Sequence, residues 1–187
     1  MIKCLSCEKF SFDIICRSCQ NRFLEPSFYK RELKDGFSVY SFYQYDDIKD
    51  LINAKYHFYG DKIFNILAKL SFEKFSHNFT FNNLVYAIPI DDHTRHDFSH
   101  TAILAKSLKS NLIDVKYNLL KATNIIKYAG HDLKFRESNK RQFIYSGQKN
   151  IQIILVDDII TTGSTILEAK LLLEESGCEV LFALTLC

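Results

Sequence analysis

The spacing of apolar residues along the chain changes between strand-like and helix-like patterns. Residues 153–156 are four apolar, β-favouring side chains in a row, as expected for a strand buried on both faces of a parallel sheet. Residues 37–43 alternate polar and apolar side chains like a half-buried strand, and residues 81–88 predict a buried strand that Pro89 ends. Residues 115–119 are a further candidate strand.

Apolar residues spaced three and four apart predict helices between these strands. The predicted helices cover residues 46–56, the segment after Gly60, residues 98–108 and residues 166–175. Residues 21–36 are mixed and charged, which is typical of a linker. Alternation of strands and helices predicts an α/β fold, in which helices flank a parallel, Rossmann-like sheet.

The strand at residues 153–156 is followed by two carboxylates, Asp157 and Asp158, and then by a small polar loop. The loop consists of Thr161, Thr162, Gly163, Ser164 and Thr165. Ligands of open α/β sheets bind beyond the carboxyl ends of the strands, and a helix N-terminus presents N–H groups to anions. The loop therefore suits a phosphate, and the two carboxylates suit a sugar diol. A capped turn without a ligand is the simpler alternative. A Walker P-loop is excluded because no Lys follows a glycine here.

Four cysteines near the start of the chain form two C-x2-C pairs, Cys4 with Cys7 and Cys16 with Cys19. Two such pairs can complete a tetrahedral thiolate site, and with all four positions used the metal is structural. We expect structural zinc; two disulfides, a redox pair and an iron–sulfur cluster are the alternatives. The remaining cysteines, Cys178 and Cys187, stand among apolar residues and are expected in the core.

Length and composition limit the class of protein. The 187 residues allow one medium domain plus a small appendage, and the apolar fraction of 47% is enough for a full core. No stretch approaches the ~20 apolar residues of a membrane span. The first residues do not resemble a signal peptide. We therefore expect a cytoplasmic protein whose thiols stay reduced.

Positive charge is concentrated in one segment, although the whole chain carries only +2. Residues 116–149 contain eight lysines or arginines and two acids, a net of +6, so the rest of the chain is near −4. Aromatic residues alternate with cations there, which suits single-stranded nucleic acid through stacking and phosphate contacts. The candidate DNA-binding residues are Lys134, Phe135, Arg136, Lys140 and Arg141. A solvated basic loop, or a basic loop over an active site, has a similar composition.

Residues 90–97 form a polar loop with two histidines, and a third, His100, follows it. His96 and His100 stand four residues apart and could bind a metal together with Asp92 or Asp97. Polar residues that face an anionic ligand, or solvent, are the alternative.

The segment from the apolar strand through residues 161–165 closely resembles the phosphoribosyl pyrophosphate (PRPP) loop of type I phosphoribosyltransferases. The resemblance implies that Asp157 and Asp158 are the catalytic residues and hold the ribose 2′ and 3′ hydroxyls. It also implies that residues 161–165 wrap the 5′-phosphate and that Mg²⁺ arrives with the pyrophosphate. The polar loop at residues 90–97 stands where this family carries its pyrophosphate-binding loop.

The order of motifs along the chain resembles the ComF (ComFC) family of competence proteins. The shared motifs are the four cysteines, Lys55-Tyr56 with Gly60-Asp61, the strand ending in Pro89, Arg136-x2-Asn139-x3-Phe143 and the PRPP loop. The resemblance implies a zinc module at residues 1–24 and a phosphoribosyltransferase-like domain at residues 25–187. At residues 96–100 only Phe98 matches the family's usual Arg-Gly-Phe-Asn-Gln, and no base-selecting hood is recognisable.

The family resemblance implies a competence accessory protein needed for natural transformation. Such a protein would bind PRPP and single-stranded DNA and assist DNA uptake at the cytoplasmic face of the inner membrane. Its expected partners are a helicase-like protein and the inner-membrane channel. The alternatives are an active phosphoribosyltransferase of nucleotide salvage and a PRPP-sensing regulator. The zinc module and basic segment favour the accessory protein, because a salvage enzyme needs neither.

Overall fold

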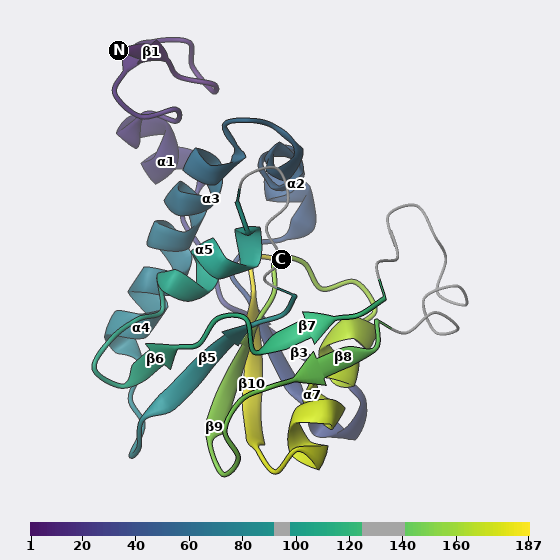
Figure 1. The fold of residues 1–187 in the computed structure, drawn as a ribbon. Coiled ribbons are helices and arrows are strands. Elements are labelled where there is room, and N and C mark those ends of the chain that lie inside the picture. The colour runs from purple at the N-terminus through teal and green to yellow at the C-terminus, as the bar shows by residue number, and fades with distance from the viewer. Residues whose placement is uncertain (92–97, 125–140) are drawn as a thin grey trace.

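A six-stranded sheet forms the centre of the structure, a computed structural model that describes residues 1–91, 98–124 and 141–187 (Figure 1). The strands, in spatial order, are β3 (Tyr29–Glu32), β4 (Ser38–Ser41), β10 (Glu179–Thr185), β9 (Gln152–Val156), β5 (Val85–Pro89) and β6 (Ile113–Val115). Every neighbouring pair is parallel except β3 with β4, which is antiparallel. The carboxyl ends of β4, β5, β9 and β10 therefore meet at one edge of the sheet, which we call the carboxyl edge.

Strand β9 is buried on both faces, as its uninterrupted apolar sequence predicts. Ile154 and Val156 pack into the hydrophobic cluster on one face of the sheet, whereas Ile153 and Leu155 pack into the cluster on the other. All four side chains are fully buried. The alternation follows from the two-residue period of a strand.

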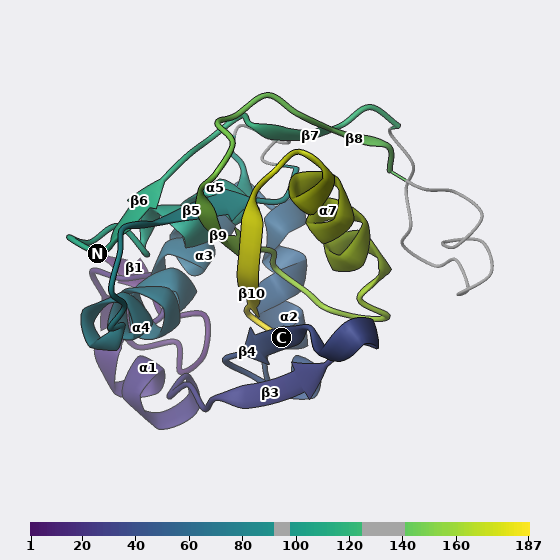
Figure 2. The ribbon, with the colours of Figure 1, turned by 90° about the horizontal axis from the view of Figure 1, so that it is seen from below.

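Helices cover both faces of the sheet (Figure 2). One face is covered by α2 (Tyr45–Asn53), α3 (Gly60–Ala68), α4 (Lys74–Asn78) and α5 (His100–Lys106). A short helical turn, η2 (Ala54–Tyr56), follows α2, and a π-helical turn, η3 (Lys69–Glu73), joins α3 to α4. The other face is covered by α7 (Ser164–Glu175) and by the antiparallel pair β7 (Leu120–Ala122) and β8 (Phe143–Tyr145).

The N-terminal segment lies beside α2 and α3 (Figure 1). It consists of the antiparallel pair β1 (Ile2–Lys3) and β2 (Phe10–Ser11), followed by α1 (Arg17–Phe23). Buried residues of this segment, including Cys4, Ile15 and Leu24, belong to the same hydrophobic cluster as α2 and α3. The cysteine-bearing segment therefore shares its core with one face of the sheet.

The structure confirms the α/β class and most predicted elements, with shifted ends. The predicted strand at residues 37–43 is β4, the strand at residues 81–88 is β5, and the helix at residues 166–175 is α7. Gly177 follows Ser176, the C-cap of α7, with a φ of +86°, as predicted for a terminating glycine. Cys178 and Cys187 are buried, as expected.

Two predictions are wrong. Residues 116–119 are not a strand, because β6 ends at Val115 and β7 begins at Leu120. The predicted linker at residues 21–36 contains the end of α1, all of β3 and the turn η1 (Lys34–Gly36). All four residues of β3 are exposed, since it is the edge strand, so it carries no apolar pattern that sequence reasoning could detect. Within the described ranges, each helix is too short or too polar to cross a bilayer.

Candidate functional site

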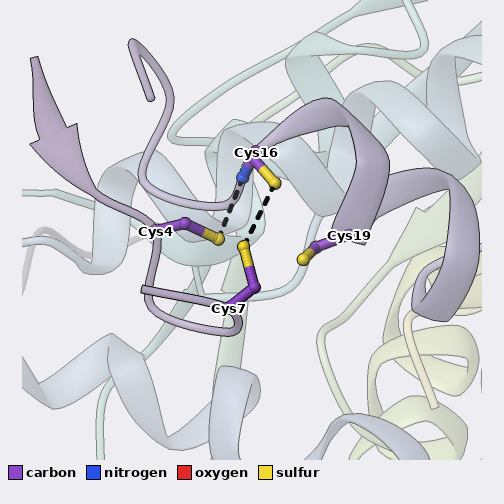
Figure 3. Close-up of side chains that lie close together, drawn as sticks. All are labelled: Cys4, Cys7, Cys16 and Cys19. Atoms are coloured by element: carbon purple, nitrogen blue, oxygen red, sulfur yellow. Dashed lines mark hydrogen bonds between the residues drawn. The ribbon is translucent and has the colours of Figure 1, made fainter. Parts of the chain in front are cut away.

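The four cysteines of the N-terminal segment come together in space (Figure 3). Cys4 and Cys7 lie on the turn between β1 and β2, Cys16 precedes α1, and Cys19 lies in its first turn. Their sulfur atoms all lie within 4.8 Å of one another, and Cys7 Sγ is 3.7 Å from Cys16 Sγ. We call this group the four-cysteine cluster.

The geometry of the four-cysteine cluster fits a metal ion. Tetrahedral zinc with Zn–S bonds near 2.3 Å places its sulfur ligands about 3.8 Å apart. All six cysteines of the chain are free thiols, so the structure does not contain the two disulfides that were one alternative to a zinc site. The cluster could therefore hold a metal ion such as zinc, as the cysteine spacing predicted.

The environment of the thiols also favours a metal. Burial raises the pKa of Cys4, but backbone N–H groups of Cys16, Cys7 and Ser6 outweigh burial and lower that pKa to about 6. The hydroxyl of Ser6 acts to lower the pKa of Cys19, yet burial and the other three thiols raise it to about 11. Four crowded sulfurs thus cannot all ionise easily without a cation, and a coordinated metal ion deprotonates its thiol ligands.

The second group of functional side chains lies at the carboxyl edge of the sheet. Asp157 and Asp158, the acidic pair, directly follow β9. Asp158 N donates to Asp157 Oδ1 at 2.8 Å. The carbonyl oxygen of Asp158 accepts from Leu186 N at 3.0 Å and Cys187 N at 3.3 Å, and this fixes the backbone of the acidic pair against the segment after β10.

Two basic groups from different elements reach Asp158. Lys55 of η2 lies with its Nζ 2.9 Å from Asp158 Oδ2, and His100, the first residue of α5, lies with its Nε2 3.5 Å from the same oxygen. The side chains of Lys55, His100 and Asp158 are 17%, 22% and 9% exposed. Asp158 is therefore a largely buried carboxylate with two basic neighbours, whereas Asp157 is half-buried.

The two carboxyl groups of the acidic pair differ in pKa. Burial acts to raise the pKa of Asp158, but the charges of His100 and Lys55 outweigh burial and hold that pKa at about 2. Burial and the neighbouring charge of Asp158 raise the pKa of Asp157 well above its usual value. The first negative charge of the pair therefore resides on Asp158.

The hydroxyl-rich loop at residues 161–165, the hydroxyl loop, leads into α7. Gly163 precedes the helix with a φ of +79°, a left-handed conformation that glycine adopts without strain. Thr162 Oγ1 lies 2.9 Å from Ser164 Oγ and accepts from Ser164 N at 3.3 Å. The loop therefore gathers hydroxyl groups at the N-terminus of a 12-residue helix, as the sequence predicted.

Strand β3 and the turn after it support the hydroxyl loop from outside. Arg31 Nη1 donates to the carbonyl oxygen of Thr161 at 2.7 Å. The side chain of Leu33 lies so close to Gly163 that a Cβ there would be 2.6 Å from a Leu33 methyl carbon. Close packing is thus a second reason for glycine at this position.

Of the five candidate DNA-binding residues, Arg141 is described and has structural contacts. Its Nη1 lies 3.0 Å from Asp91 Oδ2, just beyond the carboxyl end of β5. Its backbone N donates to Glu168 of α7 at 3.1 Å. Lys134, Phe135, Arg136 and Lys140 lie outside the described residues, and so do His96, Asp92 and Asp97 of the alternative histidine metal site.

Sequence reasoning missed the roles of Lys55, His100 and Arg31 at this edge. In the sequence, Lys55 stands out only as part of a family motif, and His100 only as a possible partner of His96. Neither has a local signal, because Lys55 and Asp158 are 103 residues apart and meet only through the fold. Gly60 is an indirect sequence signal that the position of Lys55 is constrained. A Cβ at Gly60 would lie 2.3 Å from the carbonyl oxygen of Ala54, so glycine permits the tight turn that follows Lys55.

The chain matches no protein-family model, and no curated protein matches it significantly.

Proposed function

We propose that this protein is a ComF-like competence accessory protein that binds PRPP at the carboxyl edge and assists uptake of single-stranded DNA. The observation that carries the proposal is the acidic pair followed by the hydroxyl loop at the end of the parallel strand β9. Carboxylates accept hydrogen bonds from a sugar diol, and the loop at the start of α7 offers N–H and hydroxyl donors to a phosphate. In this proposal the type I phosphoribosyltransferase fold is the frame of the site, and Mg²⁺ enters with the pyrophosphate.

The DNA part of the proposal rests on the basic segment at residues 116–149 and on the four-cysteine cluster, which a salvage enzyme does not need. Single-stranded DNA would bind through cations and aromatic rings without strong sequence preference. The protein would work at the cytoplasmic face of the inner membrane, with a helicase-like partner and an uptake channel.

An active phosphoribosyltransferase is the second candidate. Lys55, His100 and Arg141 gather near the carboxylates of Asp158 and Asp91. Fixed positive groups at such a site stabilise a departing diphosphate. Pyrophosphate release measured with a panel of nucleobases separates the two candidates, because only the transferase releases pyrophosphate in the presence of a suitable base.

PRPP binding is tested by thermal unfolding with and without PRPP and Mg²⁺. A ligand at 100 times its Kd stabilises the native state by about 2.7 kcal/mol. For a chain of this size, that corresponds to a rise in Tm of roughly 5–11 °C. Asp157→Asn should abolish the rise, whereas Asp46→Asn, at an exposed acid on α2, should retain it. No rise in the wild-type protein would refute PRPP binding.

DNA binding is tested by the salt dependence of affinity for an oligonucleotide. Each phosphate neutralised on a single strand contributes about −0.7 to the slope of log K against log [salt]. Reversing the charges of Lys134 and Arg136 together should therefore flatten the slope by roughly 1 to 1.5 units. Phe135→Ala should weaken binding by about 1–3 kcal/mol and leave the slope unchanged. If deleting residues 1–24 abolishes binding and the double reversal has no effect, the DNA contact belongs to the N-terminal segment.

A further inference from the structure

Lys55 and His100 approach Asp158 from two separate helical elements. Lys55 Nζ lies 2.9 Å and His100 Nε2 lies 3.5 Å from Oδ2 of Asp158. Lys55 belongs to η2, which directly continues α2, and His100 begins α5. Both basic groups therefore meet on one oxygen atom of one carboxylate, although the acidic pair offers four oxygens.

The backbone around each basic residue restricts its position. His57 N donates to Ala54 O at 2.8 Å, and Gly60 N donates to His57 O at 2.9 Å, so the chain turns tightly after Lys55. Ser99 caps α5 by accepting from Ala102 N at 3.2 Å, which fixes the start of the helix at His100. Lys55 and His100 thus project from ordered backbone rather than from free loops.

The position of Asp158 also affects the orientation of Asp157. The backbone N–H of Asp158 donates to Asp157 Oδ1 at 2.8 Å, so fixing Asp158 also orients the side chain of Asp157. Asp157 is half-buried, whereas Asp158 is buried against Lys55 and His100. The two carboxylates are adjacent in sequence, but Asp158 forms ion pairs with Lys55 and His100, whereas Asp157 is influenced mainly by Asp158 and, more weakly, by the charge of Arg141.

We infer that Lys55, assisted by His100, is a positioning residue of the acidic pair: it holds the Asp158 carboxylate charged and in one orientation, and so leaves Asp157 as the more accessible group for a ligand hydroxyl. The assignment of the ligand hydroxyl rests on the proposed PRPP function. The positioning of Asp158 by Lys55 does not, because it follows from the contacts alone. The two parts can therefore be tested separately.

The charges that face Asp158 agree with this assignment. They come from Lys55 of η2, His100 of α5 and the adjacent Asp157. The thiol of Cys187 after β10 also faces Asp158, but burial and Asp158 raise its pKa to about 12, so it stays neutral. Burial of Asp158 opposes ionisation, and the two basic groups outweigh burial, so its pKa stays at about 2. Without the Lys55 ammonium, burial would act against the charged form of Asp158 with one basic neighbour fewer to oppose it, and the carboxylate would lose its shorter ion pair.

The first measurement uses the ligand-free protein. The carboxyl-carbon NMR signal of Asp158 is followed against pH in the wild type, in Lys55→Met, which keeps the length of the side chain, and in Lys55→Arg, which keeps the charge. We expect Asp158 to titrate at a clearly higher pH in Lys55→Met and near the wild-type pH in Lys55→Arg. Lys49→Met, at an exposed lysine on α2, is the matched control and should titrate like the wild type. An unchanged titration in Lys55→Met overturns the inference.

The second measurement is the affinity for PRPP with Mg²⁺. Removing a partner that orients a metal-ligating side chain typically weakens metal affinity by about 10- to 100-fold, and we take the same range for a partner that orients the acidic pair. We expect a loss in that range for Lys55→Met, recovery in Lys55→Arg and no change in Lys49→Met. If the wild type binds PRPP and Lys55→Met binds equally well, the positioning role is refuted and the proposed function stands. If the wild type does not bind PRPP, the proposed function fails, and the titration still decides whether Lys55 controls Asp158.

Loss of folding in Lys55→Met would not hide the answer. The double variant Lys55→Met with Asp158→Asn removes both charges, so no uncompensated buried charge remains. If Lys55 acts through Asp158, the double variant should bind PRPP no more weakly than Asp158→Asn alone. A further loss of tenfold or more in the double variant would show that Lys55 acts by another route and would overturn the inference.

Discussion

Asp157 and Asp158 illustrate how strongly the surroundings of a residue control its chemistry. They are identical, adjacent side chains after one strand, yet Asp158 has two basic neighbours and Asp157 has mainly Asp158. The buried pair of Asp158 and Lys55 does not by itself imply extra stability, because removing both charges from water is costly. Breaking it by removing one partner is costlier, at about 3–5 kcal/mol, because a buried charge is left alone.

The pH dependence of stability should reveal the low pKa of Asp158. Its pKa is about 2 in the folded protein against an ordinary value of 3.8, so the folded state favours the ionised form. This stabilisation is fully present above about pH 4 and is lost as the pH falls toward 2. Asp158→Asn should therefore lower Tm most above pH 4, and its Tm should approach that of the wild type near pH 2.

Replacing Asp157 should change stability in the opposite direction to replacing Asp158. Its pKa is raised in the folded state, so its ionisation disfavours folding, and protonation removes this penalty as the pH falls. Asp157→Asn should thus stabilise the ligand-free protein at neutral pH and lose this advantage in acid. Thermal unfolding from pH 2 to 7 checks both variants, with Asp46→Asn as the control. If Tm changes with pH in the same way in the wild type and in both variants, the lowered pKa of Asp158 and the raised pKa of Asp157 are contradicted.

At the scale of elements, the start of α7 depends on an edge strand that is distant in sequence. Arg31 of β3 donates to Thr161 O, and Leu33 packs on Gly163. All four residues of β3 are exposed, and the strand is held in the sheet by antiparallel pairing with β4. Its contribution to the candidate site is therefore support of the hydroxyl loop.

Two glycines with similar φ angles, Gly163 of the hydroxyl loop and Gly36 of η1, allow the cost of backbone strain to be separated from the cost of lost packing. Gly163 has a φ of +79° and lies against Leu33, whereas Gly36 has a φ of +72° and no atom within 4 Å of an added Cβ. Gly36→Ala should cost only the left-handed backbone strain, roughly 1–2 kcal/mol. Gly163→Ala should cost more, because Leu33 must also move.

Chemical denaturation of both glycine variants measures these costs. Adding Leu33→Ala to Gly163→Ala should recover the packing part of the loss and leave the strain. Equal losses in Gly163→Ala and Gly36→Ala would contradict the close packing of Leu33 on the loop.

At the scale of the whole molecule, the four-cysteine cluster and the sheet share one hydrophobic core. Cys4 and Cys19 are buried in the same cluster as Ile48 and Ile52 of α2 and Phe64 of α3. Metal binding by thiolates of a folded site contributes to folding free energy. A metal bound at the N-terminal segment should therefore stabilise the whole chain.

Cys7→Ser tests this coupling, because Cys7 is exposed and its replacement leaves the core intact. Metal analysis should find one zinc ion per wild-type chain and none, or weakly bound zinc, in the variant. A loss of about 2 kcal/mol would lower Tm by roughly 4–8 °C for a chain of this length. We expect a single unfolding transition, shifted to lower temperature. If the main unfolding transition is unchanged and a separate one appears at lower temperature, the N-terminal segment unfolds independently. Iron in place of zinc in the metal analysis would refute the zinc assignment.

Local patterns determined much of the fold and part of the candidate site. The paired cysteines, the apolar run of β9, the acidic pair and the hydroxyl loop each lie within a few consecutive residues, so their geometry follows from the period of a strand, a turn or a helix. Strand β3 escaped detection because an exposed edge strand has no buried face to impose a pattern.

Tertiary structure alone decided the difference between the two carboxylates. Sequence treats Asp157 and Asp158 alike, since both follow the same strand. The order of the parallel strands brings η2 and α5 to the carboxyl edge, and there Lys55 and His100 both meet Oδ2 of Asp158. The charge and orientation of a buried carboxylate depend on burial and on partners from distant elements, which no local period encodes.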